Sequence, residues 1–188
     1  GSLMAEQSFE SITMSQIAER AGVGRTAVYN HFADKEVLLL AYMREVTSEF
    51  ARILTQRLDA EPDPLMRLRI YVRSHLQMIG RYHVKAGMGL RRQMSGQGAS
   101  HLHDHAGIVG ELLIGILDEA MERGLIVEQN TLGAVHLIHA TLQGQRLPQD
   151  PAHRESALLL VETFILRGLG ASEENVHQVT ASSLVLGE

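Results

Sequence analysis

Apolar residues recur at three- and four-residue spacing along almost the whole chain of 188 residues. The clearest stripe consists of Val109, Leu112, Leu113, Ile116, Leu117 and Ala120. This spacing places side chains on one face of an α-helix, whereas a half-buried strand alternates apolar and polar residues. No sustained alternation occurs, so the sequence predicts an all-α fold.

The four prolines of the chain divide it at two places. Pro62 and Pro64 separate a first block of helices from a second, and Pro148 and Pro151 introduce the last long helix. Proline interrupts the interior of a helix but suits its first position. We predict eight or nine helices, with long or medium ones at 35–58, 131–145 and 152–169 and a short one beginning near Ser172.

The composition excludes several classes of protein. The chain has no cysteine, so it has neither a disulfide framework nor a thiolate metal site. No apolar run is long enough to span a bilayer and no secretory signal is visible, so we predict a cytoplasmic protein without membrane contact. The net charge of −5 does not favour nucleic-acid binding, although phosphate contact needs only a local basic face.

Residues 13–32 predict two short helices joined by a tight turn. Thr13 and Gln16 have the spacing of a capping box, which opens the first helix. Gly22 provides the left-handed backbone conformation that ends this helix sharply. We expect Ala21 to face inward and Val23 to fill the corner between the helices. Two helices in this arrangement form a helix-turn-helix, whose second helix enters the major groove of DNA.

The second of these helices is predicted to begin near Arg25 and to return Val28 and Phe32 to the core. The positions that packing does not need are Arg25, Thr26, Ala27, Tyr29, Asn30 and His31. An arginine can bind guanine or phosphate, and hydroxyl or imidazole groups suit phosphates. Lys35 adds a cation at the start of the next helix. An ordinary helical corner with a solvated face explains the same pattern.

Residues 17–39 resemble, nearly position by position, the DNA-binding signature of the TetR family of transcriptional regulators. The most specific elements are 21–23, Tyr29, 31–32, and 35–36 with the two leucines that follow, and Phe9 matches the aromatic residue expected upstream. The resemblance covers about residues 3 to 45. It implies DNA contacts from Thr13, Arg25, Thr26, Tyr29, Asn30, His31 and Lys35. Two positions depart from the family pattern: Gly24 lacks a hydroxyl to cap the second helix, and Ser8 stands where glycine is usual.

The resemblance also implies the domain organisation. An N-terminal three-helix DNA-binding domain, residues 1–47, precedes a C-terminal helical domain for ligand binding and dimerisation, residues 48–188. Only eight residues precede Phe9, so we expect the first helix of the DNA-binding domain to be truncated. Residues 1–47 contain four basic and six acidic residues, which favours binding as a dimer to a two-fold operator.

The implied function is that of a ligand-responsive regulator, a repressor that a small-molecule effector releases from double-stranded operator DNA. No cofactor is required, and we expect a homodimer rather than an enzyme. The alternatives are a histidine-liganded metal-binding helical protein or enzyme, and a helical dimer without DNA affinity. The sequence contains no nucleophile–base pairing, no His-Glu-x-x-His and no phosphate loop.

Ten histidines are many for a chain of this length. His101, His103 and His105 lie close together and could hold a transition metal, although a polar helix start explains them equally. For the effector pocket we predict Met78, Tyr82, His136 and His139, because a buried imidazole can orient a ligand.

The segment 152–169 is apolar around most of its circumference. Only a narrow strip formed by Glu155, Glu162 and Arg167 is polar. A helix of this kind is buried on more than one side, either in the centre of its domain or against a partner subunit. We favour the partner, and predict dimerisation through Leu158, Val161 and Ile165.

Overall fold

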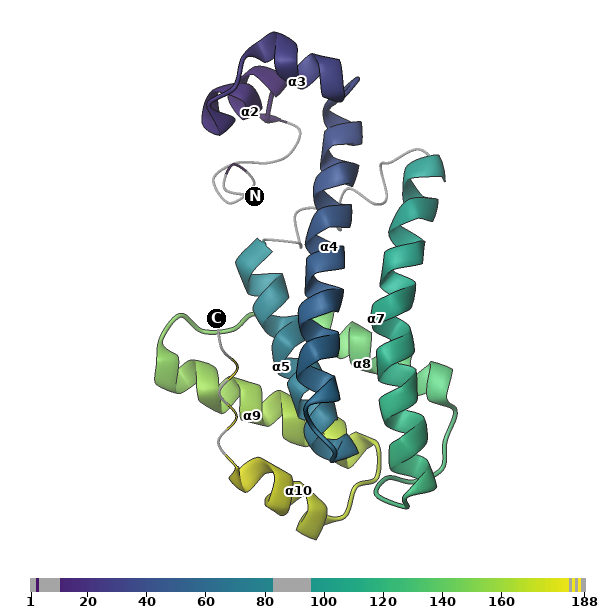
Figure 1. The fold of residues 1–188 in the computed structure, drawn as a ribbon. Coiled ribbons are helices and arrows are strands. Elements are labelled where there is room, and N and C mark those ends of the chain that lie inside the picture. The colour runs from purple at the N-terminus through teal and green to yellow at the C-terminus, as the bar shows by residue number, and fades with distance from the viewer. Residues whose placement is uncertain (1–2, 4–10, 83–95, 183, 185, 187–188) are drawn as a thin grey trace. The chain divides into compact units, whose positions relative to one another are not determined.

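The computed structural model of the chain describes residues 3, 11–82, 96–182, 184 and 186; for 80–82 and 96–106 it describes the backbone alone. The described residues form helices and no strand (Figure 1), which confirms the predicted all-α fold. The helices are α2 (Met14–Ala21), α3 (Arg25–His31), α4 (Lys35–Asp59), α5 (Pro64–Tyr82), α7 (Gly96–Glu122), α8 (Thr131–Gly144), α9 (Pro151–Gly168) and α10 (Glu173–Ala181). The predicted truncated first helix lies largely outside the described residues.

Short polar side chains begin the helices of the C-terminal half. The side chain of Asn130 accepts a hydrogen bond from the amide of Gly133 at 2.7 Å, at the start of α8. Asp150 caps α9, with Pro151 next to it in the first turn, and Ser172 caps α10. These caps satisfy amides that have no partner within the helix. The predicted starts of all three helices are confirmed to within one residue.

The chain divides into two compact units, which are described separately below. The first unit comprises Gly1–Phe50 and Ile79–Gly107, and the second comprises Ala51–Met78 and Ile108–Glu188. The domain boundary predicted at residues 47 and 48 falls within α4 and stays a prediction. Among the described residues, no helix is both long enough and apolar enough to span a membrane.

The core of the second unit is built mainly from α5, α7 and α8. On α7, five of the six residues in the predicted apolar stripe are buried, and Leu113 is fully inaccessible. The buried apolar residues of α5 and α8 are Leu65, Leu68, Ile70, Tyr71, Val72, Leu76, Ala134, Val135, Ile138 and Leu142. The helical periodicity of the sequence therefore identified the interior face of these helices.

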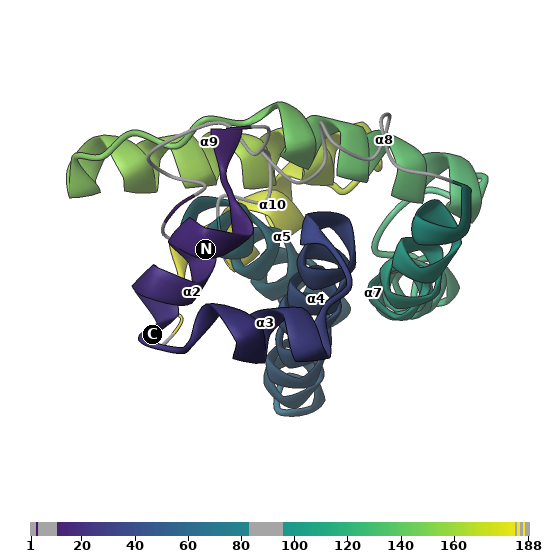
Figure 2. The same cartoon turned by 90° about the horizontal axis from the view of Figure 1, so that it is seen from above.

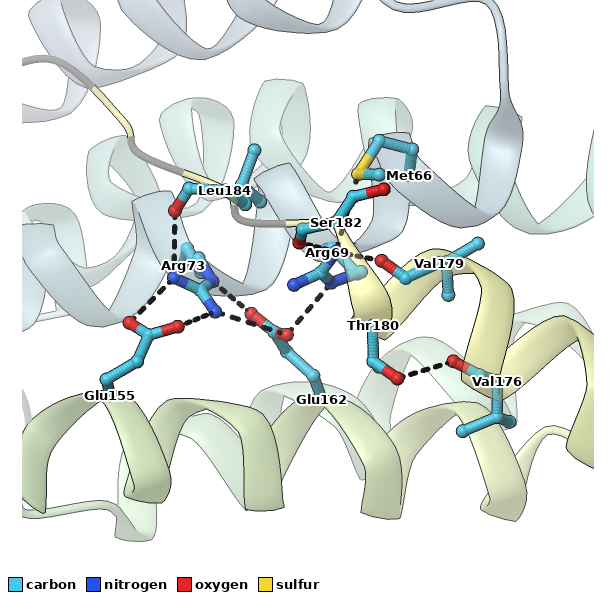
Figure 3. A network of polar contacts seen from close by, with 10 residues as sticks. All are labelled: Met66, Arg69, Arg73, Glu155, Glu162, Val176, Val179, Thr180, Ser182 and Leu184. Carbon is cyan, nitrogen blue, oxygen red and sulfur yellow. Dashed lines mark hydrogen bonds and ion pairs between the residues drawn. The ribbon is translucent and has the colours of Figure 1, made fainter.

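A buried ionic network joins α5 to α9 (Figure 3). The carboxylate of Glu162 accepts hydrogen bonds from Nε of Arg69, at 2.9 Å, and from Nε of Arg73. Arg73 also binds Glu155 through two hydrogen bonds of 2.6 and 3.0 Å. Burial alone would lower the pKa of Arg73, but the hydrogen bonds to Glu155 and Glu162 outweigh that effect and raise it. The network fixes the charge state of both arginines inside the protein.

The same two arginines hold the segment that follows α10. Arg69 donates to the carbonyl oxygens of Val179 and Ser182, and Arg73 donates to that of Leu184 at 2.9 Å. Figure 3 shows these carbonyl groups reaching the guanidinium groups from the side opposite α9. The arginines of α5 therefore lie between α9 and the C-terminal segment.

The polar strip predicted on α9 faces the protein rather than solvent at its centre. Glu162 is only 1% exposed because the arginines of α5 surround it. Leu158, Val161 and Ile165 are also buried within the chain, whereas Leu160 and Phe164 are 71% and 64% exposed. The exposed apolar face of α9 is thus carried by different residues from those predicted for dimerisation.

Candidate nucleic-acid interface

The first helix of the predicted corner begins at a complete capping box. The amide of Gln16 donates to Oγ1 of Thr13 at 3.2 Å, and the amide of Thr13 donates to Oε1 of Gln16 at 2.8 Å. The helix ends at Gly22, whose φ of 67° is left-handed and whose amide returns to the carbonyls of Ala18 and Glu19. Both signals predicted from the sequence are confirmed.

A small apolar core holds α2 and α3 together. Its buried members are Met14, Ala18 and Val28, and the half-buried side chains of Ile17, Phe32 and Leu38 pack against them. Two details of the prediction are wrong, because Ala21 and Val23 are exposed. The close approach of the helices at Ala18 leaves no room in the corner for either side chain.

The outer face of α3 is polar and accessible. Arg25, Thr26, Tyr29, Asn30 and His31 are all exposed, and only Val28 of this helix is buried. Gly24 is the N-cap residue and makes no side-chain capping bond, as expected from its missing hydroxyl. A seven-residue helix anchored by one valine therefore presents five polar side chains.

Two predicted DNA contacts serve other bonds in this structure. Thr13 is exposed, but its hydroxyl forms the capping box of α2. Nζ of Lys35 donates to the carbonyl oxygen of Ile12 at 2.9 Å, and its side chain is half-buried. Asp34 caps α4 by accepting from the amides of Glu36 and Val37 at 2.8 and 2.9 Å.

A cluster of three hydrogen-bonding rings lies within the second unit. The hydroxyl of Tyr71 on α5 is 2.6 Å from Nε2 of His139 on α8. The ring of His75 stacks against both, with centroid distances of 5.9 Å to Tyr71 and 5.5 Å to His139. Tyr71 is fully buried, and both histidines are mostly buried. Sequence reasoning missed Tyr71 and His75, because α5 and α8 meet only in the folded chain.

The histidines of this cluster are neutral near pH 7. Burial, reinforced by the charge of a protonated His139, lowers the pKa of His75 to about 4. Burial, and secondarily His136, lowers the pKa of His139, while burial raises that of Tyr71. The cluster therefore offers uncharged donors and acceptors.

The other predicted ligand residues are scattered. Met78 is half-buried and His136 is exposed on α8. The side chains of Tyr82, His101, His103 and His105 lie outside the described residues. Among the residues with described side chains, no group of three histidines or carboxylates has metal-binding geometry.

Two short helices that meet at a left-handed glycine, the second with an exposed polar face, define a helix-turn-helix DNA-binding protein. Residues 2–42 match the family model "Bacterial regulatory proteins, tetR family". The chain belongs to this TetR family of transcriptional regulators, as the sequence predicted; the family is one of regulatory proteins rather than enzymes.

Relatives match the sequence in this region and the fold over most of the chain. The transcriptional regulator BetI of Klebsiella pneumoniae (strain 342) is 41% identical over 58 residues, which is 31% of this chain and only 30% of BetI. The structure is similar to that of the TetR-family regulator PfmR from Thermus thermophilus, with a TM-score of 0.75, 21% identity, and coverage of 89% and 94% of the two chains. The regulator AibR, solved with isovaleryl coenzyme A and operator DNA, gives a TM-score of 0.65 at 18% identity, with coverage of 84% and 91%.

Proposed function

We propose that this chain is a repressor that binds a two-fold DNA operator as a homodimer and leaves it when a small-molecule effector binds. The observation that carries the proposal is the exposed polar face of α3, formed by Arg25, Thr26, Tyr29, Asn30 and His31. The buried Val28 and the core of α2 support this face from behind. Such a protein would work in the cytoplasm and would need no cofactor.

The side chains of α3 suit both kinds of DNA contact. A guanidinium group such as that of Arg25 can donate two hydrogen bonds to the major-groove edge of guanine, and an amide such as that of Asn30 can pair with adenine. The hydroxyl of Tyr29 and the imidazole of His31 suit backbone phosphates. Arg25 and Asn30 would therefore set the sequence preference, and Tyr29 and His31 the orientation.

The experiment is an unbiased selection of duplexes from a randomised library by the full chain, followed by affinity measurements on the enriched duplex. Arg25→Ala should weaken binding by about 1–3 kcal/mol and relax the preference at one base pair of each half-site. Arg44→Ala removes an exposed cation from α4 instead and is the matched control; it should leave the enriched sequence unchanged. A chain that enriches no sequence contradicts the proposal.

The homodimer is proposed from the exposed apolar side chains of α8 and α9. Leu137 on α8 is 72% exposed, and Leu160 and Phe164 lie one turn apart on α9 with 71% and 64% exposure. Figure 2 shows both helices along one side of the second unit. Burying a leucine or phenylalanine side chain contributes about 1.5–3 kcal/mol, so pairing this face with a second copy is strongly favoured. Leu158, Val161 and Ile165 would then support the interface from within each subunit.

Sedimentation velocity tests the dimer. Leu160→Glu places two charges in a symmetric interface, because each residue occurs in both subunits. We expect this variant to sediment as a monomer. Ile108→Glu, which alters an exposed apolar residue of α7, should leave the dimer intact. Equal effects of the two substitutions, or none from Leu160→Glu, would place the interface elsewhere.

The effector is proposed to bind in the second unit beside the ring cluster and Met78, with His136 and Tyr82 as the remaining candidates. AibR was solved with an acyl coenzyme A, and a FadR regulator of similar fold with stearoyl-CoA. The carbonyl of a thioester is an uncharged acceptor, which suits the neutral rings of Tyr71 and His139. We therefore propose an acyl coenzyme A as the effector class.

Release of the enriched duplex by isovaleryl coenzyme A, with free coenzyme A as the control, tests this class. Tyr71→Phe keeps the ring but removes the hydroxyl, and should raise the concentration needed for release about fivefold, the effect of one neutral hydrogen bond. Failure of every acyl chain length to release DNA would disprove the effector class and leave the DNA-binding proposal standing.

A further inference from the structure

Lys35 joins the start of α4 to the residue that precedes the N-cap of α2. Its Nζ lies 2.9 Å from the carbonyl oxygen of Ile12, although 23 positions separate the two residues in sequence. We propose that Lys35 is a positioning residue, which sets the direction of the recognition helix α3 by closing the loop of α2 and α3 against α4, rather than a cation that contacts a DNA phosphate.

The carbonyl of Ile12 is available for this bond because of its place in the chain. The helical ladder of α2 begins with the carbonyl of Thr13, which accepts from the amide of Ile17 at 3.1 Å. Ile12 lies one residue earlier, and its side chain is only 3% exposed. A buried residue just outside a helix needs a partner for its carbonyl group, and the ammonium group of Lys35 provides one.

The start of α4 is rigid enough to direct this side chain. Asp34 caps the helix through two amides, so the backbone of Lys35 is held in the first turn. A cation in the first turn of a helix gains nothing from the helix dipole, which favours negative charge there. The bond to Ile12 offsets this disadvantage and ties the entrance of α2 to the entrance of α4.

The consequence for DNA binding follows from the small size of the core. Three buried residues, Met14, Ala18 and Val28, hold α2 and α3 together. The Lys35–Ile12 bond adds a polar restraint from α4, so its loss frees the two-helix unit to tilt. Docking in the major groove requires one orientation, and a tilted α3 binds more weakly without losing any phosphate contact.

The salt dependence of DNA affinity separates positioning from phosphate contact. Each phosphate that a cation neutralises contributes about 0.9 to the slope of log affinity against log salt, so a phosphate-binding residue lost from both subunits changes that slope by about two. Lys35→Met should weaken binding to the duplex enriched by the wild-type chain about tenfold, the loss of one charged hydrogen bond. Its change in slope should be less than half that of Arg25→Met, the matched loss of an exposed cation.

Two further measurements complete the test. Lys35→Arg keeps both the charge and the donor and should restore most of the affinity. In the DNA-free protein, Lys35→Met should speed amide hydrogen exchange at residues 13–17 about tenfold, since it removes one charged hydrogen bond, whereas Arg25→Met should leave it unchanged. This exchange measurement does not depend on the DNA-binding function on which the proposal rests, so the two can fail separately.

Three results would overturn the proposal. A slope change for Lys35→Met as large as that for Arg25→Met would make Lys35 a phosphate contact. Unchanged affinity would remove its role in DNA binding altogether. Unchanged exchange at residues 13–17 would show that the bond does not restrain α2.

Discussion

The carboxylate of Glu162 has the largest predicted effect of any single side chain on the stability of the second unit. It is fully buried and lies between the guanidinium groups of Arg69 and Arg73. Glu162→Gln keeps the size of the side chain but removes its charge. Two buried cations then lose the anion that compensates them, and Arg69 has no other carboxylate among its described partners.

The magnitude follows from burial. Breaking a buried ion pair by removing one partner costs about 3–5 kcal/mol, because the remaining charge stays desolvated. Glu155 provides the comparison, since it binds the same Arg73 but its side chain is 50% exposed. An exposed ion pair contributes about 1 kcal/mol or less. Glu162→Gln should therefore cost several times as much as Glu155→Gln.

Urea unfolding followed by circular dichroism measures both variants. With a denaturant slope of about 2 kcal/mol per molar, Glu162→Gln should lower the unfolding midpoint by about 2 M, and Glu155→Gln by about 0.5 M or less. Equal shifts would refute the reasoning, because they would show that burial of the carboxylate does not determine the cost. A larger shift for Glu155→Gln would locate the essential anion at the surface.

Three other substitutions test the pH dependence and the helix ends. The pKa of His75 is about 4 in the folded chain against an ordinary value of 6.5, so the unfolded chain binds a proton first as the pH falls. Stability should drop by about 3 kcal/mol between pH 6.5 and pH 4, and His75→Leu should flatten this dependence in urea titrations; an unchanged profile would assign it to other groups. Gly22→Ala places a side chain at a φ of 67° in open space, so its cost of about 1 kcal/mol is purely conformational, and an unchanged melting temperature would contradict this. Gly24→Ser adds the missing cap of α3 at an ordinary φ and should stabilise the chain by about 0.5 kcal/mol in thermal unfolding, whereas a loss would mean that the hydroxyl does not reach the helix amides.

Local signals predicted the helix-turn-helix well. The capping box of Thr13 and Gln16 and the left-handed Gly22 each depend on residues only a few positions apart, so their geometry is visible in the sequence. Val23 was misplaced because its burial depends on how closely α2 and α3 approach at Ala18. Lys35 was expected at DNA, since the bond to Ile12 joins residues that meet only after both helices have formed.

Long-range partners explain what the sequence did not reveal in the second unit. The charge of Glu162 looked like part of a solvated strip on α9, but two arginines from α5 turn that strip inward. Because the charged face is buried, the apolar Leu160 and Phe164 are left outside, which reverses the face predicted for dimerisation. The pairing of Tyr71 with His139 is hidden in the same way, by a separation of 68 positions.

The segment after α10 would be an easy target for trimming when a shorter version of this protein is prepared. Its carbonyl groups at Ser182 and Leu184, however, accept hydrogen bonds from the guanidinium groups of α5. Ending the chain at Ala181 would expose part of a charged interior to water and to proteases. A shortened version that is meant to be sturdier would therefore be more prone to aggregate, and affinity tags are better attached beyond residue 186 than in place of the segment.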